Sequence, residues 1–309
     1  MKTISIIIPV YYNENSLQLL FEALLSLEKK LLDKNINLQL IFVDDGSGDG
    51  SFHELIKIKA QRPKTILIKL SRNFGAIRAE KTGYRYVTGD CFCTLSADLQ
   101  DPPELIEEMV ERWLNGSKFT ICVRSQREDT FVSRFFSRVY YRLVQGLVFK
   151  EFPKGGFDLA LMDKIFLSYL LASGKNINIA LFSYSLGFAP EIIEYKRRKR
   201  LHGQSRWSFT KKFNYFMDSI LGFSVIPLHL ISWIGIFIAL VSVLYGFYVA
   251  MSVILEGREV PGFAALFTLT AFLSGLTLTM LGIIGQYIWR IFDQLNGTPE
   301  SVIELELLD

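Results

Sequence analysis

The chain has little cysteine, and nothing at its start is typical of an export signal. Its three cysteines, Cys91, Cys93 and Cys122, all lie in apolar runs that resemble strands. Buried, reduced thiols are therefore expected, and Cys91-x-Cys93 alone is a poor metal signature. The β-branched run at 4–10 is too short for a secretory signal, and no cleavage site follows it. We therefore expect the N-terminal domain to stay in the cytoplasm.

The chain also has no glycine-rich phosphate loop. No Gly-x-Gly-x-x-Gly follows the first apolar run, and no P-loop pattern occurs. These absences argue against a dinucleotide site or a P-loop site. They point instead to a nucleotide whose phosphates are held by a metal ion.

Charge is absent from two long segments near the C-terminus. Between residues 218 and 256 the only titratable side chains are His229 and tyrosines, and between 259 and 290 there is no acidic or basic residue. Each segment can cross a bilayer, which takes about 20 residues. With 50% hydrophobic residues and a mean hydropathy of +0.26, the chain is predicted to carry transmembrane helices at about 227–255 and 262–290.

Lysines and arginines crowd before the first of these segments and are scarce in the hairpin at 256–262. The positive-inside rule then places the hairpin outside and both termini in the cytoplasm. We expect a multi-pass protein of the inner (cytoplasmic) membrane, with a cytoplasmic domain over 1–216 and a membrane domain over 217–309. Two-helix anchors can pack against copies of themselves, so a homo-oligomer stays open.

The rest of the chain alternates between apolar strands and amphipathic helices. Such alternation predicts an α/β domain with a mostly parallel sheet and right-handed crossovers. Polar residues gather after each strand, so they should converge on one edge of the sheet. The expected strand–helix pairs are 4–10 with 17–27, 38–43 with 52–59, 65–70 with 76–86, and 91–95 with 104–114.

The turn after the fourth strand, at 96–101, is the main candidate site. Asp98 and Gln100 lie two residues apart and could share a divalent cation, Mg²⁺ or Mn²⁺, with the phosphates of a ligand. The alternative is an acidic loop that only caps the next helix. Asp44, after the second strand, could accept hydrogen bonds from a nucleobase or ribose, or it could belong to an ordinary acidic turn.

Two basic segments follow. Over 131–149 a wide apolar face lies beside Arg134, Arg138 and Arg142, which recur every four residues. Such a helix suits a membrane interface, although a core-packed helix with one solvated face has the same pattern. The basic cluster at 196–200 comes with no nucleic-acid-binding module. The expected partner is therefore an anionic lipid surface or a pyrophosphate, and not nucleic acid.

In this order, the motifs resemble the family-2 glycosyltransferases that act on polyprenyl phosphates, the dolichyl-phosphate mannose synthase and bacterial undecaprenyl-phosphate glucosyltransferase group. The matching stretches run along most of the chain and are followed by the two apolar segments. They are Ile-Pro-Val-Tyr-Tyr-Asn-Glu (8–14), Val-Asp-Asp-Gly-Ser (43–47), Leu-Ser-Arg-Asn-Phe-Gly (70–75), Ala-Asp-Leu-Gln-Asp-Pro-Pro-Glu (97–104), Asp-Leu-Ala-Leu-Met-Asp-Lys (158–164) and Arg-x-x-Arg-x-x-Gly-x-Ser (197–205).

The resemblance implies a GT-A (Rossmann-like) fold, a nucleotide-sugar donor, a divalent metal and inversion at the anomeric carbon. It implies that Asp98 and Gln100 hold the metal, and that Asp158 faces the reacting centre as a catalytic residue together with Asp98. The residues implied to bind the acceptor phosphate are Arg124, Arg134 and Ser137, and those implied to contact the nucleotide sugar are Pro9, Tyr11, Glu14, Asp44, Ser96, Ala97, Asp98 and Arg200.

Two positions depart from the family pattern. Ser96 stands where the family usually has an aspartate, so metal affinity should be weaker. Ala160 stands where the family usually has an arginine, so donor contacts or sugar choice can differ. The run 204–207, Gln-Ser-Arg-Trp, is one residue short of the Gln-x-x-Arg-Trp signature of processive synthases, which argues against a polymerase.

The expected function is transfer of a hexose, most simply glucose, from a UDP-sugar to undecaprenyl phosphate at the cytoplasmic face of the membrane. Two alternatives stay open. One is a non-catalytic, membrane-anchored protein that binds nucleotide sugars, and the other is a processive polysaccharide synthase.

Overall fold

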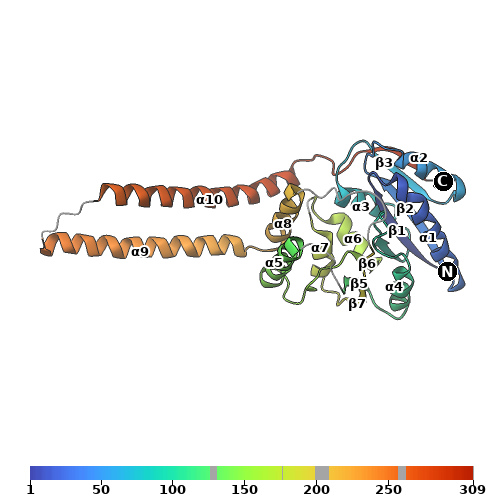
Figure 1. Ribbon diagram of the computed structural model, residues 1–309, viewed down its shortest axis with the longest axis horizontal. Helices are drawn as coiled ribbons and strands as arrows, with labels where there is room; N and C mark the ends of the chain where they lie inside the picture. The colour runs from blue at the N-terminus through green and yellow to red at the C-terminus, as the bar shows by residue number, and fades with distance from the viewer. Residues whose placement is uncertain (126–130, 176, 199–208, 257–261, 309) are drawn as a thin grey trace. The chain divides into compact units, whose positions relative to one another are not determined.

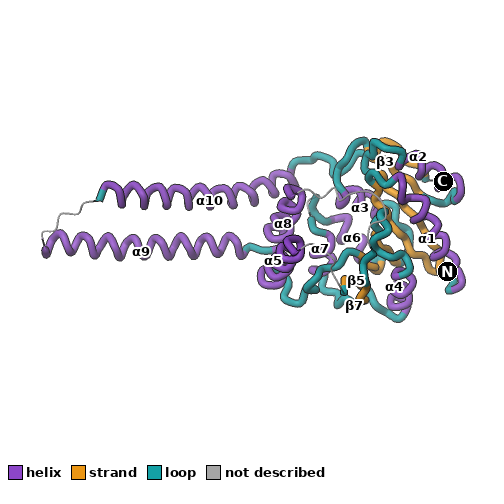
Figure 2. Tube along the Cα trace, viewed as in Figure 1, coloured by secondary structure: helices purple, strands orange, loops and turns teal. Residues whose placement is uncertain are grey.

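The computed structural model describes residues 1–125, 131–175, 177–198, 209–256 and 262–308 (Figures 1 and 2). The chain divides into two compact units. One contains residues 1–222 and 299–309, and the other contains residues 223–298. Arg200 and the 204–207 run lie outside the described residues.

One eight-stranded sheet forms the centre of the first unit. Its strands are β1 (Lys2–Val10), β2 (Ile36–Asp44), β3 (Ile66–Leu70), β4 (Cys91–Thr94), β5 (Phe119–Arg124), β6 (Leu159–Asp163), β7 (Glu191–Tyr195) and β8 (Ile303–Leu307). Their order in space is β7-β5-β6-β4-β1-β2-β3-β8. The pairs β1–β2, β1–β4, β2–β3 and β5–β7 are parallel. β6 is antiparallel to β4 and β5, and β8 is antiparallel to β3.

Helices cover both faces of the sheet because successive side chains of a strand point to opposite sides. Ile6 and Ile8 of β1 belong to the core on one face, and Ile7 belongs to the core on the other. All three are fully buried, and each such side chain contributes roughly 1.5–3 kcal/mol relative to an exposed one. The first face is covered by α1 (Glu14–Asp33), α2 (Ser51–Gln61) and α4 (Leu105–Leu114), and the second by α3 (Ala76–Tyr84), α6 (Ile165–Ala172) and α7 (Ile179–Ser185).

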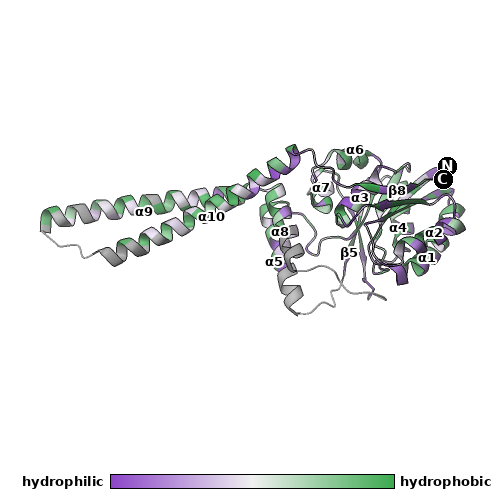
Figure 3. Cartoon of the chain, turned by 90° about the horizontal axis from the view of Figure 1, so that it is seen from above, coloured by the Kyte–Doolittle hydropathy of each residue, from purple (hydrophilic) through white to green (hydrophobic). Residues whose placement is uncertain are grey.

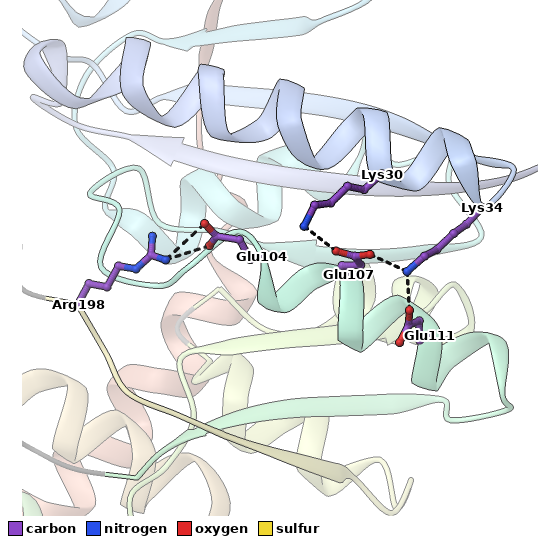
Figure 4. Close-up of polar contacts among 6 residues, drawn as sticks. All are labelled: Lys30, Lys34, Glu104, Glu107, Glu111 and Arg198. Carbon is purple, nitrogen blue, oxygen red and sulfur yellow. Dashed lines mark hydrogen bonds and ion pairs between the residues drawn. The ribbon is translucent and has the colours of Figure 1, made fainter.

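Charged side chains join α1 and α4 at the surface (Figure 4). Glu107 pairs with Lys30 and Lys34 at N–O distances of 3.1 and 2.7 Å, and Glu111 pairs with Lys34 at 2.5 Å. Exposed pairs of this kind contribute at most about 1 kcal/mol each. The apolar side chains beneath them therefore hold the two helices against the sheet.

The sheet confirms the expected α/β class and all four strand–helix pairs predicted from the sequence. The three cysteines are buried and free, as expected. The end of the chain differs from the prediction, because residues 303–307 pair with β3 and belong to the first unit. The assignment of all of 217–309 to a membrane domain is therefore wrong at its C-terminal end.

The second unit is a pair of long apolar helices, α9 (Ile226–Glu256) and α10 (Phe263–Leu295). Both are long and apolar enough to cross a membrane, with candidate spans Leu228–Tyr248 and Phe272–Leu295. Figure 3 shows hydrophobic residues along both helices. Trp233 and Phe237 are 70% and 66% exposed. An exposed apolar surface of this extent is typical of a protein–protein or membrane interaction site.

The first unit also carries two helices that pack against each other, α5 (Phe131–Leu147) and α8 (Phe209–Phe223). The Tyr140 hydroxyl of α5 donates to Ser219 Oγ of α8 at 2.9 Å, and Asn178 Nδ2 donates to the same oxygen at 2.9 Å. Arg138 and Arg142 of α5 are exposed. A helix therefore occupies most of the predicted range 131–149, and its place at a membrane interface stays a prediction.

Candidate active site

The carboxyl ends of β1, β2, β4, β5 and β7 lie at one edge of the sheet, as the strand pairing requires. Because β6 runs antiparallel between β4 and β5, its first residue and the preceding Asp158 lie at the same edge. Open α/β sheets bind ligands outside the carboxyl ends of their parallel strands. The predicted convergence of polar residues on one edge is therefore confirmed.

The loops that follow β1 and β2 interlock at this edge. The Tyr12 amide donates to Ser47 Oγ at 3.1 Å, and the Gly50 amide donates to Glu14 Oε2 at 3.0 Å. Tyr12 has a φ of 56°, in the left-handed region. Its ring packs edge-on against Tyr11 with centroids 4.7 Å apart. Strained backbone of this kind persists where the surrounding contacts fix it, and it is frequent at functional sites.

Two adjacent carboxylates at the end of β2 accept hydrogen bonds from different loops. Asp44 is fully buried, and its oxygens accept the Ser47 amide at 3.4 and 3.3 Å. Burial raises the pKa of the Asp44 carboxyl. Asp45 accepts the amides of Phe74 and Gly75 at 2.7 and 2.9 Å. Asp45 therefore fixes the loop after β3, while Asp44 organises its own loop.

The turn after β4 presents Asp98 in a locally fixed position. Asp98 is 8% exposed, and its Oδ1 accepts Ser96 Oγ at 3.0 Å and the Gln100 amide at 3.2 Å. Leu99 has a φ of 58° and a side chain that is buried in the core. The carbonyl of Ala97 accepts Ser16 Oγ of α1 at 2.8 Å. The turn is thus anchored on both sides of the carboxylate.

This turn supplies a hard carboxylate oxygen and a side-chain amide oxygen, a donor set that suits Mg²⁺ or Mn²⁺. Over the part of the chain that the structure describes, no group of three or more His, Cys, Asp or Glu side chains is placed to hold a metal ion. Mg²⁺ usually keeps several waters and binds substrate phosphates through few protein ligands. Asp98 and Gln100 fit that kind of site.

An ion pair joins the ends of β5 and β6. Arg124 Nη2 pairs with Asp158 Oδ2, and the two side chains are 15% and 39% exposed. Arg124 Nε is buried, and within the described residues it has no hydrogen-bond partner. The structure thus brings together two residues to which the sequence assigned separate roles, one toward the acceptor phosphate and one at the reacting centre.

A second polar cluster lies next to this pair and was missed from the sequence. Asp101 is 4% exposed, accepts the Tyr195 hydroxyl at 2.5 Å and pairs with Arg197 at 3.2 Å. Burial raises the pKa of Asp101. The Arg198 amide donates to the Gln100 carbonyl at 3.0 Å, and its guanidinium pairs with Glu104 (Figure 4). The chain leaving β7 is therefore joined to the turn that carries Asp98.

The remaining predicted residues are placed as follows. Pro9 lies in β1 opposite Val43 of β2, and Ser137 is a partly buried residue of α5. Arg134 also belongs to α5, but its side chain lies outside what the structure describes. The loops after β1 and β2 are joined by hydrogen bonds, and so are α1 and the turn after β4.

Comparison with known proteins agrees with this architecture. The model of glycosyl transferase family 2 matches residues 5–168. The chain is 32% identical over 299 residues to "uncharacterized glycosyltransferase sll0501" of Synechocystis sp., covering 96% of this chain and 93% of the relative. It is 27% identical over 303 residues to the bactoprenol glucosyl transferase of Shigella phage SfX, covering 97% and 98%.

Two solved structures share the fold. Mannosyl-3-phosphoglycerate synthase from Rubrobacter xylanophilus has a TM-score of 0.53 at 15% identity, over 72% of this chain and 73% of that one. Glucosyl-3-phosphoglycerate synthase from Mycobacterium tuberculosis, solved with Mn²⁺ and uridine-diphosphate-glucose, has a TM-score of 0.51 at 16% identity, over 71% and 79%. The matched family model, the near full-length relatives and the GT-A-like α/β domain agree with one another. The chain is a glycosyltransferase and belongs to glycosyl transferase family 2.

Proposed function

We propose that the protein transfers a glucose-like hexose from a UDP-sugar to undecaprenyl phosphate at the cytoplasmic face of the membrane, with inversion at the anomeric carbon. The observation that carries the proposal is the match to relatives named bactoprenol glucosyl transferase. That match covers 97% of this chain and so includes both apolar helices as well as the sheet domain. The shared fold of a synthase solved with UDP-glucose and Mn²⁺ is consistent with a UDP-sugar donor.

The chemistry suits a site that acts mainly on the leaving group. A lipid phosphate is already anionic at pH 7, so its oxygen can attack the anomeric carbon with little need for a general base. The bond between that carbon and the diphosphate oxygen breaks, and UDP leaves. A divalent cation held by Asp98 and Gln100 would offset the negative charge on the departing diphosphate. Asp158 would orient the acceptor or take its residual proton.

The proposed contacts follow the carboxyl edge of the sheet. Donor contacts are assigned to the loops after β1, β2 and β4 and to the basic segment after β7. Acceptor contacts are assigned to the end of β5 and to α5. The donor residues are Pro9, Tyr11, Glu14, Asp44, Ser96, Ala97, Asp98 and Arg200, and the acceptor residues are Arg124, Arg134 and Ser137.

The membrane is the place where such an acceptor is found. We propose that α9 and α10 span the bilayer and that α5 lies in its cytoplasmic interface. The exposed Arg138 and Arg142 would then face lipid phosphates. A polyprenyl chain partitions into the bilayer, so only its phosphate has to reach the sheet edge.

The test uses the purified full-length protein with radiolabelled UDP-sugars, undecaprenyl phosphate and Mg²⁺ or Mn²⁺. We expect lipid-extractable label that requires both the lipid phosphate and the metal, with UDP-glucose as the best donor. UDP binding without any product would indicate a non-catalytic binding protein. A labelled polymer would indicate a processive synthase. Either result would overturn the proposal.

A further inference from the structure

The Arg124–Asp158 ion pair joins a more buried side chain to a more exposed one. Arg124 is the last residue of β5, between β6 and β7, and its side chain is only 15% exposed. Asp158 precedes the first residue of β6, and its side chain is 39% exposed. Asp158 is therefore the partner that an incoming ligand can reach more easily.

Arg124 also has binding capacity that the pair does not use. Its Nη2 contacts Asp158, while its Nε is buried without a hydrogen-bond partner among the described residues. A guanidinium fork matches a phosphate with two parallel N–H···O bonds. A phosphate at Arg124 would satisfy the unused donor and compete with the Asp158 carboxylate for the same charge.

We infer that Arg124 is a selectivity residue that keeps Asp158 paired until an anionic acceptor arrives. This inference rests on the proposed function. Without acceptor, the Asp158 carboxylate stays engaged by the guanidinium. When the acceptor phosphate binds Arg124, it takes the place of the Asp158 carboxylate on the guanidinium. The consequence is a site that transfers sugar to a phosphate in preference to water.

The two competing reactions differ in where the proton goes. In transfer, a phosphate oxygen bonds to the anomeric carbon, the bond from that carbon to UDP breaks, and UDP departs with the bonding pair. In hydrolysis, water forms that bond and must lose a proton, so a nearby carboxylate has to act as base. While Asp158 Oδ2 is engaged by Arg124 Nη2, that oxygen is occupied and is not free to take the proton from water. Breaking the pair should favour hydrolysis selectively.

The experiment measures free labelled sugar and lipid-linked labelled sugar released from the same UDP-sugar. In Arg124→Gln we expect transfer to fall and the ratio of hydrolysis to transfer to rise on the order of tenfold or more, since general-base catalysis contributes roughly 10²–10⁴-fold when fully effective. The double variant Arg124→Gln, Asp158→Asn should lose the extra hydrolysis. Arg124→Lys, which keeps the charge without the fork, should give an intermediate ratio.

Arg62→Gln is the matched control. Arg62 pairs with Glu28 at 2.6 Å with side-chain exposures of 12% and 21%, and it also donates to the Leu38 carbonyl near the start of β2, at the opposite edge of the sheet. Its ratio of hydrolysis to transfer should equal that of the wild type.

The outcomes separate two failures. Absence of lipid-linked product from the wild type would overturn the proposed function itself. Normal wild-type transfer combined with an unchanged ratio in both Arg124 variants would overturn only the selectivity role. The selectivity role would also be overturned if the double variant keeps the extra hydrolysis seen in Arg124→Gln.

Discussion

At the scale of single residues, Ser96 in the turn after β4 stands where the family pattern has an aspartate. This difference changes both the charge and the hydrogen bonding of the turn. Ser96 donates its hydroxyl proton to Asp98 Oδ1 at 3.0 Å. A carboxylate at position 96 could not donate that bond and would add a second negative charge. The chain therefore has a hydrogen bond to Asp98 where the family pattern has a second carboxylate. In the proposed metal site, Asp98 would be the principal anionic ligand of the turn.

Asp98→Ala should reduce sugar transfer by at least about 100-fold, because the charge offset at the leaving group is lost. The fold should persist, since Asp98 Oδ1 accepts hydrogen bonds from Ser96 and Gln100 of its own turn. Turnover at saturating Mn²⁺ and the thermal unfolding midpoint measure the two effects. Ser96→Ala is the control, with a smaller loss of roughly tenfold, the lower end for a group that orients a metal ligand. Near-normal turnover of the Asp98 variant would contradict the metal assignment.

The titration of Glu80 of α3 should make the free energy of unfolding depend on pH. Its Oε1 accepts the Thr94 hydroxyl at 2.6 Å and also the Tyr84 hydroxyl. Burial raises the pKa of Glu80 from 4.5. The folded state therefore holds this proton to higher pH than the unfolded state does. The resulting stabilisation is complete below the unfolded pKa and is lost as pH rises through the folded pKa.

Glu80→Gln removes that titration and keeps an oxygen that can accept both hydroxyls. The variant should gain stability relative to wild type as pH rises from about 4.5, and the gain should level off above the folded pKa. Denaturant unfolding of both proteins across pH 4 to 8 measures it. A difference that does not change with pH would contradict the assignment.

The site residues that the sequence predicts and those that it misses differ in how far along the chain their interaction partners lie. Asp98 and Gln100 share one turn, so their spacing alone predicts that they act together. Asp101 lies in the same turn, but its partner Tyr195 is on β7, and that contact depends on the strand order β7-β5-β6-β4. A local pattern carries no information about which strand inserts between two others.

At the scale of elements, β8 has a strand pattern in its sequence although the predicted membrane domain includes it. Residues 303–307, Ile-Glu-Leu-Glu-Leu, alternate between apolar and charged side chains, which is the period of a half-buried strand. The pairing of β8 with β3 covers an edge that would otherwise expose unpaired backbone groups.

A buried ion pair fixes the chain just before β8. Lys81 Nζ of α3 pairs with Glu300 at 2.7 Å, with side-chain exposures of 3% and 17%. It also donates to the carbonyls of Ser173 and Gly174 at 2.9 and 3.3 Å. All three protons of the ammonium group therefore have acceptors.

Removal of either charge should leave the other buried without compensation. Lys81→Met is expected to cost about 3–5 kcal/mol of stability, and the double variant with Glu300→Gln should cost less than the sum of the single changes. Lys69→Met is the control, because its pair with Glu304 has exposures of 27% and 50% and should contribute less than about 1 kcal/mol. Denaturant midpoints of the full chain provide the comparison. Additive effects at Lys81 and Glu300 would contradict the coupling.

At the scale of the whole molecule, the chain passes from the first unit into the helical pair and returns to the same unit. Residues 1–222 and 299–309 share one compact unit, and β8 completes its sheet. A chain that leaves and re-enters one folded unit must cross the membrane an even number of times. If α9 and α10 span the bilayer as proposed, this argument and the distribution of lysine and arginine both predict a hairpin on the side opposite the sheet.

Cysteine labelling tests that topology directly, because Cys91, Cys93 and Cys122 are all 0% exposed and should give little background. In sealed right-side-out vesicles, a membrane-impermeant maleimide should label Val260→Cys in the hairpin. It should label Asn115→Cys, at an exposed position after α4, only after the vesicles are opened. The reverse pattern would invert the orientation, and labelling of both positions in sealed vesicles would mean that α9 and α10 do not span the bilayer.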